Sequence, residues 1–547
     1  MPILNWLGRD EALKTAAKTP YRLLEEVPEL GYGDKSADNM IVQGDNLEAL
    51  KALLPFYAGQ VKCIYIDPPF NTKSMQNIYY DDNIENSKWL SIMFPRLELL
   101  HEFLAENGVI FVHLNMIQIS YMQVMLDEIF GRNNFLQKIT VKAASTASFR
   151  AINLCPVTIS EYILMYAKNK TYYQRNMQYV ESDYSEDYGY IIENFEQSPD
   201  KWKLSKLCDI IYKNEGINDW KEFKNLYGDD YKIIRFYKMK KIALKYPERI
   251  VSLNTLQKPS KEIQKIIEKS KIERNKFFVI NRENADSIYV YNGRTLAFFK
   301  KKIRNIDGLS VPTDVMTNIW TDISYLSLGL EGGVDFPNSK KPERLIKRIL
   351  EIATDEKDLV LDSFLGSGTT AAVAHKMGRR YIGIEMGNHA ITHCVPRLKA
   401  VVDGEQGGIS KAVNWQGGGG FRFYKLGDEV FDAEGCINEK ISFENLSSHI
   451  WFTETKTPFN KPKSKSTYLG NYDGKDYALL YNGILKDKKV DGGNVLTNKT
   501  LNVILEDMGN KPYDKLIVYG ESSRISETRL KSLNIEFKQT PYDIKAR

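Results

Sequence analysis

The stretch Val61-Lys-Cys-Ile-Tyr-Ile-Asp67-Pro68-Pro69-Phe70 decides how this chain folds. Its first six residues are mostly apolar and predict a buried strand over 61–66. Asp67 follows this strand directly. Parallel α/β sheets bind their ligands beyond the carboxyl ends of their strands. The tetrapeptide from Asp67 to Phe70 is therefore expected where such a sheet carries its chemistry.

The tetrapeptide suits an amino group attached to a flat ring. Pro68 and Pro69 remove two backbone donors and stiffen the chain. The Asp67 carboxylate and the Pro68 carbonyl can then each accept one N–H of an exocyclic amine, and Phe70 can stack on the ring. The alternative is a rigid turn capped by Asp67. The position at the end of a buried strand favours a binding role.

Strand and helix signals alternate around this stretch. Apolar runs predict strands over 40–43 and 109–114, and helical spacing predicts a helix over 89–106. After a long irregular stretch the same rhythm returns, with strands over 358–362 and 380–385. Strands that alternate with helices favour a parallel α/β sheet.

A second motif joins a later strand to a helix. It reads Asp362-Ser-Phe364-Leu-Gly366-Ser-Gly368-Thr369. Glycines let the backbone approach a ligand closely, and a helix N-terminus favours polar or negative groups. Glu385 ends the next strand, where an acid suits the two hydroxyls of a ribose. The motif predicts a site for an adenosine-type cofactor, with a tight glycine turn as the alternative. A phosphate loop is disfavoured because the sequence G-x-x-x-x-G-K-[ST] does not occur.

The domain organisation follows from this rhythm. Each α/β piece is small for a doubly wound domain, so we expect a single sheet interrupted by a long insert. The expected parts are an N-terminal arm (1–37), a discontinuous α/β domain (38–142 and 336–403), an insert (143–335), a glycine-rich linker (404–425) and a small C-terminal α/β or α+β domain (426–547). In the last part, Asp473-Gly474 predicts a hairpin, and a strand, helix and strand follow over 516–538.

Charged residues are unevenly distributed along the 547 residues, whose net charge is +5. Residues 232–307 contain 20 Lys and Arg against 7 Asp and Glu, whereas residues 181–200 contain seven acidic residues and no basic one. A segregated basic block suggests a polyanionic partner. The alternative is a solvated surface.

Composition disfavours several classes of protein. No stretch approaches the roughly 20 apolar residues of a membrane helix, and the N-terminus does not resemble a secretory signal, so we expect a cytoplasmic protein with no membrane partner. The five cysteines lie far apart, which argues against a disulfide framework or a zinc site.

The two motifs together resemble those of DNA amino-methyltransferases that use S-adenosylmethionine. In that family a D-P-P-Y/F/W tetrapeptide grips the base and an F-x-G-x-G loop holds the cofactor. Here Phe364 follows Asp67 by 297 residues, an order that resembles the β arrangement with its target-recognition domain between the motifs. The resemblance implies a Rossmann-like methyltransferase sheet with permuted motif order, and it places target recognition in the insert.

The resemblance extends to two further segments. Gly44-Asp45-Asn-Leu-Glu-Ala-Leu looks like the segment whose acid approaches the cofactor adenine, and Phe336-Pro-Asn-Ser-Lys-Lys341-Pro342 looks like the one that contacts the cofactor's methionine part. Over most of 38–425 the chain is similar to modification subunits of type III restriction–modification systems. It departs from the family pattern at Ser363, where Pro is frequent, and at Phe70, where Tyr is commoner.

The resemblance implies an enzyme that methylates N6 of a flipped-out adenine in double-stranded DNA without a metal. N4-cytosine methylation and a non-catalytic DNA-recognition subunit are the alternatives. A restriction/helicase subunit and a second copy of the chain are the implied protein partners. Tyr79 and Tyr80 are candidates to line the base pocket, whereas His113 is expected to be structural.

Overall fold

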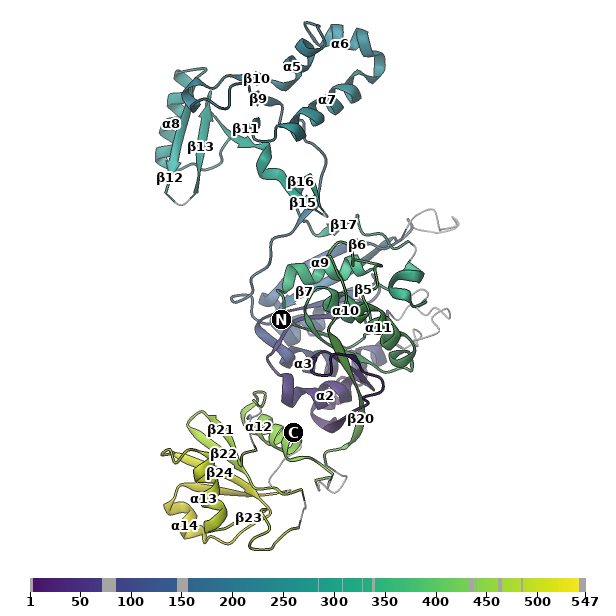
Figure 1. The fold of residues 1–547 in the computed structure, drawn as a ribbon, viewed down its shortest axis with the longest axis vertical. Coiled ribbons are helices and arrows are strands. Elements are labelled where there is room, and N and C mark those ends of the chain that lie inside the picture. Colours follow the sequence, from purple (N-terminus) through teal and green to yellow (C-terminus); the bar gives the residue numbers. More distant parts are fainter. Residues whose placement is uncertain are drawn as a thin grey trace. The chain divides into compact units, whose positions relative to one another are not determined.

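The structure is a computed structural model, shown as a ribbon in Figure 1. It describes residues 3–70, 85–144, 156–283, 285–306, 308–326, 328–336, 340–431, 437–438, 440–460, 465–483 and 486–540. The chain divides into a first unit, residues 1–176 with 317–547, and a second unit, residues 177–316.

An eleven-stranded sheet forms the centre of the first unit. Its order is β1-β20-β3-β19-β18-β4-β5-β7-β6-β17, and β2 pairs with β20. The strands are β1 (Arg22–Glu26), β2 (Tyr32–Gly33), β3 (Met40–Gln43), β4 (Val61–Ile66), β5 (Leu104–Leu114), β6 (Phe135–Lys142), β7 (Ser160–Ala167), β17 (Ile319–Trp320), β18 (Leu359–Asp362), β19 (Arg380–Glu385) and β20 (Gly420–Glu429). The run from β20 to β5 is parallel, and β7 is antiparallel to β5.

The two halves of the predicted sheet meet at two strand pairs, β18 with β4 and β19 with β3. Strand β18 is the parallel neighbour of β4, with Val360 opposite Cys63 and Leu361 opposite Ile64. The tetrapeptide that follows β4 and the glycine loop that follows β18 therefore begin at the same edge of the sheet. This confirms the prediction of one α/β sheet built from separated stretches.

Helices pack on both faces of this sheet. They are α1 (Arg9–Lys18), α2 (Asn46–Tyr57), α3 (Asn86–Phe103), α4 (Ile119–Leu126), α9 (Glu343–Ala353), α10 (Thr369–Lys376) and α11 (Val395–Val402). Ile64 and Ile66 share a core with residues of α2 and α3, whereas Cys63 and Tyr65 are buried on the other face. Helix α9 contacts β4 and β5. The helix predicted over 89–106 ends earlier, because Leu104 already pairs with Val61.

The N-terminal segment is not a free arm, which corrects the expectation for 1–37. Helix α1 packs on α3, and the Trp6 indole Nε1 donates to Ser91 Oγ at 2.9 Å. Strands β1 and β2 both pair with β20. Ala12 and Ala16 are buried, so α1 packs against the rest of the first unit through a small apolar face.

The predicted linker over 404–425 ends inside the sheet. Strand β20 begins at Gly420 and runs parallel to β3, with Phe421 and Phe423 buried. A Cβ on Gly420 would lie 2.3 Å from the backbone nitrogen of Asp34, so glycine permits the close approach of β2. The glycine-rich stretch thus serves in part as a strand start.

The second unit is shorter than the predicted insert of 143–335. Strands β7 and β17 belong to the main sheet, since the apolar residues of β7 are buried against β5 and β6. The unit is also more regular than the sequence indicates. It contains β8 (Tyr179–Glu181), β9 (Tyr190–Ile192), β10 (Leu204–Lys206), α5 (Leu207–Asn214), α6 (Trp220–Tyr227), α7 (Tyr231–Lys245), β11 (Ile250–Asn254), α8 (Lys261–Ile272), β12 (Phe277–Arg282), β13 (Ala285–Tyr291), β14 (Arg294–Phe298), β15 (Ile303–Ile306) and β16 (Leu309–Val315).

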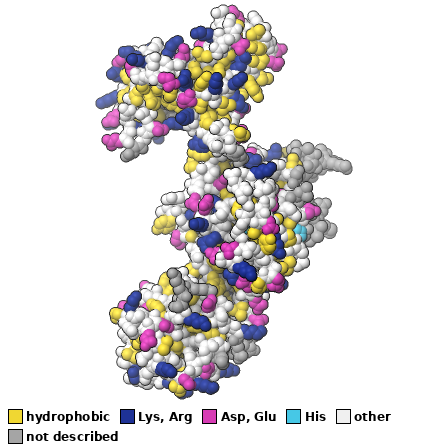
Figure 2. All heavy atoms as spheres, in the orientation of Figure 1, with side chains coloured by type: hydrophobic (Ala, Val, Ile, Leu, Met, Phe, Trp, Pro, Cys, Tyr) yellow, Lys and Arg dark blue, Asp and Glu magenta, His cyan; other side chains and the backbone are white. Residues whose placement is uncertain are grey.

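Part of the basic block is neutralised within the second unit. Lys240 pairs with Asp183 at 2.7 Å, and Arg235 pairs with Glu186 at 3.1 Å. Both acids come from the acidic stretch 181–200. Figure 2 accordingly shows Lys and Arg side chains interspersed with acidic ones on this unit. Over 177–316 there are 26 Lys and Arg against 21 Asp and Glu, so the unit stays basic but less so than its central segment.

The C-terminal part forms its own small sheet with the order β21-β22-β24-β26. Its elements are α12 (Phe443–Thr455), β21 (Tyr468–Tyr472), β22 (Lys475–Leu479), β23 (Val495–Leu496), α13 (Asn498–Asp507), β24 (Lys515–Gly520), β25 (Ser522–Ser523), α14 (Glu527–Ser532) and β26 (Ile535–Gln539). The predicted hairpin is confirmed, because Asp473 and Gly474 both have positive φ, as a type I′ turn requires. Within the described ranges, no helix is long and apolar enough to span a membrane.

Candidate active site

The carboxyl edge of the parallel strands gathers most of the predicted site residues. Asp45 follows β3, Glu385 ends β19, Asp362 ends β18 and Asp67 follows β4. The order of these strands is β3-β19-β18-β4. Four acids separated widely in the sequence therefore stand at successive positions along one edge.

The tetrapeptide is held rigidly by neighbouring elements. The indole Nε1 of Trp89, on α3, donates to the Pro69 carbonyl at 2.8 Å. Asn115 Nδ2, beyond β5, donates to the Phe70 carbonyl at 3.4 Å. Asp67 Oδ1 is buried and has no hydrogen-bond partner among the residues that the structure describes. This oxygen is thus an acceptor with unused capacity on a fixed turn.

Lys341 lies at the tetrapeptide. Its Nζ is 3.0 Å from Asp67 Oδ2 and 3.7 Å from Glu161 Oε2. The same Nζ lies over the Phe70 ring, 4.6 Å from the ring centroid. Burial raises the pKa of Asp67, although Lys341 opposes this effect. Lys341 was expected to contact the cofactor, but here its ammonium contacts the residues expected to bind the base. Pro342 is the N-cap residue of α9.

Three further residues complete this part of the site, and none of them was predicted to bind a ligand. Glu161, on β7, lies 2.8 Å from His113 Nε2, and the Tyr65 hydroxyl lies 2.9 Å from His113 Nδ1. His113 is fully buried at the end of β5. In the sequence, Glu161 is a charged residue directly before the apolar run 162–167, which is the one sign that it is unusual. Its position beside β5 follows only from the pairing of the strands.

The glycine loop is shaped by Glu385. Its carboxylate accepts the backbone N–H of Gly366 at 2.7 Å and that of Gly387 at 3.2 Å. Gly366 and Gly368 have φ of 56° and 81°, where other residues are strained. The Phe364 N–H donates to Asp362 Oδ1 at 2.9 Å. Glu385 therefore fixes the loop, and its contact with a ribose remains a prediction.

Asp45 ties the end of β3 to its surroundings. Asp45 Oδ1 caps α2 by accepting the N–H groups of Leu47 and Glu48, and Oδ2 lies 2.8 Å from Arg96 Nη2. The next residue, Asn46, donates to the Ser363 carbonyl at 2.7 Å, which connects this turn to the glycine loop. A contact between Asp45 and the cofactor adenine remains a prediction. Tyr79 and Tyr80 lie outside the described residues.

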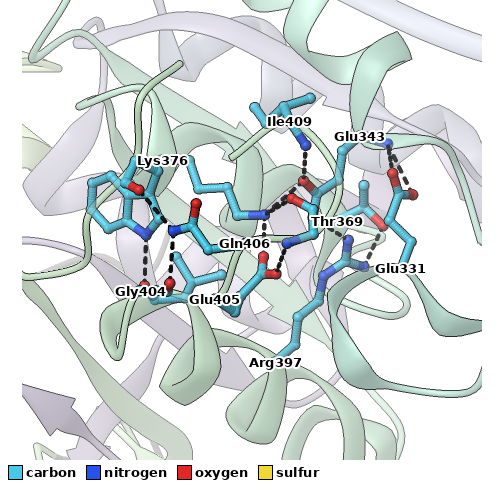
Figure 3. Close-up of polar contacts among 12 residues, drawn as sticks. Glu331, Glu343, Thr369, Lys376, Arg397, Gly404, Glu405, Gln406 and Ile409 are labelled. Carbon is cyan, nitrogen blue, oxygen red and sulfur yellow. Dashed lines mark hydrogen bonds and ion pairs between the residues drawn. The ribbon is translucent and has the colours of Figure 1, made fainter. Parts of the chain in front are cut away.

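A buried charged network supports the glycine loop from behind (Figure 3). The Glu343 carboxylate accepts from Lys376 Nζ and from Arg397 Nη2, each at 2.8 Å, and all three side chains are fully buried. Arg397 Nη1 donates to the Thr369 hydroxyl at 2.7 Å. That contact connects the network to the first residue of α10, directly after Gly368.

The electrostatics of the edge suit a positively charged ligand. Burial raises the pKa of Asp362 to about 7, and the nearby Asp67 and Glu385 carboxylates act in the same direction. A cation near these carboxyl groups would relieve this repulsion. Within the described ranges, His, Cys, Asp and Glu form no group of three that could hold a metal ion. An organic cation such as a sulfonium fits the arrangement.

Asp362 predicts a specific dependence of stability on pH. Its folded-state pKa of about 7 lies above the ordinary value of about 4, so the folded protein retains a proton that the unfolded chain releases. This carboxyl therefore makes the free energy of unfolding fall as pH rises from 4 to 7. We expect Asp362→Asn to reduce that fall in urea unfolding at pH 5 and pH 7. The exposed carboxyl variant Asp10→Asn is the control, and equal slopes for both variants and wild type would refute the assignment.

A parallel sheet with the Asp67–Phe70 tetrapeptide and the glycine loop after neighbouring strands is the architecture expected of an amino-methyltransferase. The model of the DNA methylase family N6_N4_Mtase matches residues 61–395, and the chain belongs to this family.

Type III modification subunits are among its curated relatives. The probable type III restriction-modification enzyme HindVI Mod subunit of Haemophilus influenzae is 34% identical over 444 residues, which cover 75% of this chain and 58% of the relative. The type III EcoPI Mod subunit of Escherichia phage P1 is 28% identical, over 68% of this chain and 60% of the relative. The chain thus spans about three fifths of the length of these relatives.

Solved structures show a weaker likeness. The M1.HpyAVI–SAM complex is 15% identical with a TM-score of 0.29, covering 66% of this chain and 98% of that one. A likeness at this level supports no argument about this chain.

Proposed function

We propose that this protein is an S-adenosylmethionine-dependent methyltransferase that modifies N6 of adenine in double-stranded DNA. One observation carries the proposal: the rigid Asp67 turn and the glycine loop follow paired parallel strands, β4 and β18. Membership of the DNA methylase family supports the same reading.

The tetrapeptide would activate a weak nucleophile. The lone pair of the adenine amine is delocalised into the ring, which makes the amine a weak nucleophile. Positive charge develops on the nitrogen as this lone pair forms the bond to the methyl group. Asp67 Oδ1 and the Pro68 carbonyl would accept the two N–H groups and stabilise that charge by fixed electrostatics. Proton loss from the methylated amine can follow, so Asp67 need not act as a strong base beforehand.

The base must leave the duplex to reach this turn. Flipping costs a few kcal/mol. Stacking on Phe70 would recover roughly 1–3 kcal/mol of this cost. The Trp89 and Asn115 hydrogen bonds to the tetrapeptide backbone would hold the stacking surface in place.

The cofactor would lie along the glycine loop and supply an electrophilic methyl group. Asp362, Phe364, Gly366 and Gly368 would form its cradle, and the Thr369 backbone begins α10 beside it. Glu385 and Asp45 are proposed for its ribose and adenine, and the backbone at Lys341 and Pro342 for its methionine part. The carboxyl groups of the edge fit its positive charge.

Transfer of a labelled methyl group tests the activity. The full chain is incubated with labelled S-adenosylmethionine and unmodified genomic DNA, and the DNA is digested to nucleosides. We expect the label in 6-methyladenine. Label in 4-methylcytosine would make the adenine assignment wrong. If the cofactor binds but labels no DNA, the chain is a non-catalytic recognition subunit.

The second unit is proposed as the target-recognition domain. The two ends of this unit lie side by side, because the Met316 N–H donates to the Gln178 carbonyl at 3.0 Å. Replacing residues 177–316 by the corresponding unit of a relative is expected to change the methylated sequence and to leave cofactor affinity within about twofold of wild type. Sequencing of modified bases and cofactor titration measure the two effects. An unchanged target sequence would refute the domain assignment.

The relatives also support a role as a modification subunit of a type III system. We propose that the chain acts beside a restriction subunit, because the relatives cited above are named Mod subunits of type III restriction-modification enzymes. The family resemblance also implies a homodimer. Light scattering of the purified chain tests the dimer, and co-purification with a co-expressed restriction subunit tests the partner.

A further inference from the structure

The position of Lys341 raises a specific problem for the proposed reaction. Its ammonium lies 3.0 Å from Asp67 Oδ2 and 4.6 Å from the centre of the Phe70 ring. These are the carboxylate and the ring face that the target base would use. The ammonium therefore occupies the two positions that the base would need: its amine would lie at the Asp67 carboxylate, and its ring would lie on Phe70.

A second carboxylate stands next to this ammonium. Glu161 Oε2 is 3.7 Å from Lys341 Nζ, a separation beyond hydrogen-bond distance but within an ion pair. Lys341 therefore needs only a small shift to exchange one carboxylate for the other. Glu161 comes from β7, whereas Asp67 follows β4, so the two carboxylates belong to different elements.

Glu161 is itself fixed and charged. His113 Nε2 lies 2.8 Å from it, and His113 Nδ1 lies 2.9 Å from the Tyr65 hydroxyl. When Tyr65 donates to Nδ1, the ring carries its proton on Nε2, the nitrogen that faces the Glu161 carboxylate. Burial opposes the charge, but Lys341 and His113 lower the pKa of Glu161 to about 2. The carboxylate is thus ionised at neutral pH and anchored on two central strands.

We propose that Lys341 holds the place of the target base in the free enzyme and moves onto Glu161 when the base enters. Glu161 is then a positioning residue that keeps the ammonium paired, and His113 and Tyr65 orient it. The departure of the ammonium removes its charge from the Asp67 carboxylate and uncovers the Phe70 ring for the base. The inference rests on the proposed function and adds how the site admits its substrate.

Removing the charge of Glu161 tests this exchange. In Glu161→Gln the ammonium keeps Asp67 as its one counterion among the residues that the structure describes, so base entry must separate a buried ion pair. The target sequence is first read from the modified bases that wild type leaves in a host genome. A duplex of that sequence with 2-aminopurine at the target position then reports flipping by its fluorescence. We expect Glu161→Gln to lower the fluorescence gain at least fivefold and kcat/KM for DNA at least tenfold, with cofactor Kd within twofold of wild type.

A second substitution separates this mechanism from a general loss of structure. In Glu161→Gln/Lys341→Met no ammonium competes for Asp67, and the fluorescence gain is expected to return to within threefold of wild type. The exposed variant Glu25→Gln on β1 is the control. If Glu161→Gln melts at a lower temperature than wild type, Glu161→Asp replaces it, and an intermediate loss is expected because the shorter side chain keeps the charge.

The outcomes are distinct. A wild type that modifies no DNA refutes the proposed function. An active wild type together with a Glu161→Gln variant of unchanged flipping and kcat/KM overturns the exchange. So does a double variant as impaired as the single one, because Glu161 would then act independently of Lys341. A cofactor Kd raised more than twofold in Glu161→Gln also overturns it, since the pair would then serve the cofactor.

Discussion

Asp67→Ala is expected to lower the rate of methyl transfer by about 10²–10³-fold or more, the scale seen when one preorganised group that stabilises transition-state charge is removed. The variant loses the acceptor Oδ1, and only the Pro68 carbonyl would remain for the amine. The fold should tolerate the change, because Lys341 still has Glu161 within 3.7 Å. Single-turnover transfer of a labelled methyl group to DNA measures the rate.

Cofactor affinity and a control variant distinguish a loss of catalysis in Asp67→Ala from a loss of structure. Cofactor affinity of Asp67→Ala should stay within about threefold of wild type, because the glycine loop is fixed by Glu385 and not by Asp67. Asp428→Ala, an exposed carboxyl variant of β20, should transfer methyl groups at the wild-type rate. A fully active Asp67→Ala would remove the tetrapeptide from the mechanism.

Glu343→Gln is expected to lower the free energy of unfolding by about 3–5 kcal/mol, because buried Arg397 loses its paired carboxylate and Lys376 loses one of two, the other being Glu405. Arg397 also holds the Thr369 hydroxyl, so the glycine loop should loosen and cofactor affinity should fall as well. Urea unfolding and cofactor titration measure the two effects.

A matched control lies on the same helix. Glu351 pairs with Lys347 at 2.8 Å on the partly exposed face of α9. Glu351→Gln should change the free energy of unfolding by no more than about 0.5 kcal/mol, the scale of i,i+4 surface pairs. If Glu343→Gln were as mild as Glu351→Gln, the buried network would not support the loop.

The sequence indicated the central sheet well for a physical reason. Strands buried on both faces read as short apolar runs, and each of those over 61–66, 358–362 and 380–385 ends in or before a carboxyl group. The order of the motifs then required the two pieces to share an edge. The parallel pairing of β4 with β18 confirms that inference.

Other features depend on contacts that a pattern does not encode. Glu161 and His113 meet only because β7 returns antiparallel to β5, and neither residue stands in a motif. Lys341 was assigned from its motif alone, whereas its contacts depend on where α9 begins. The regularity of the second unit escaped prediction because most of its strands are only partly buried, so their hydrophobic periodicity is weak.

Sequencing of modified bases shows whether the chain methylates adenine and whether Asp67 is needed for it. The full chain and its Asp67→Ala variant are each expressed in a host without DNA methyltransferases of its own, and the host genomes are read for modified bases. We expect N6-methyladenine in one sequence context with wild type and an unmodified genome with the variant. Modification that persists in Asp67→Ala, or 4-methylcytosine in place of N6-methyladenine, would contradict it.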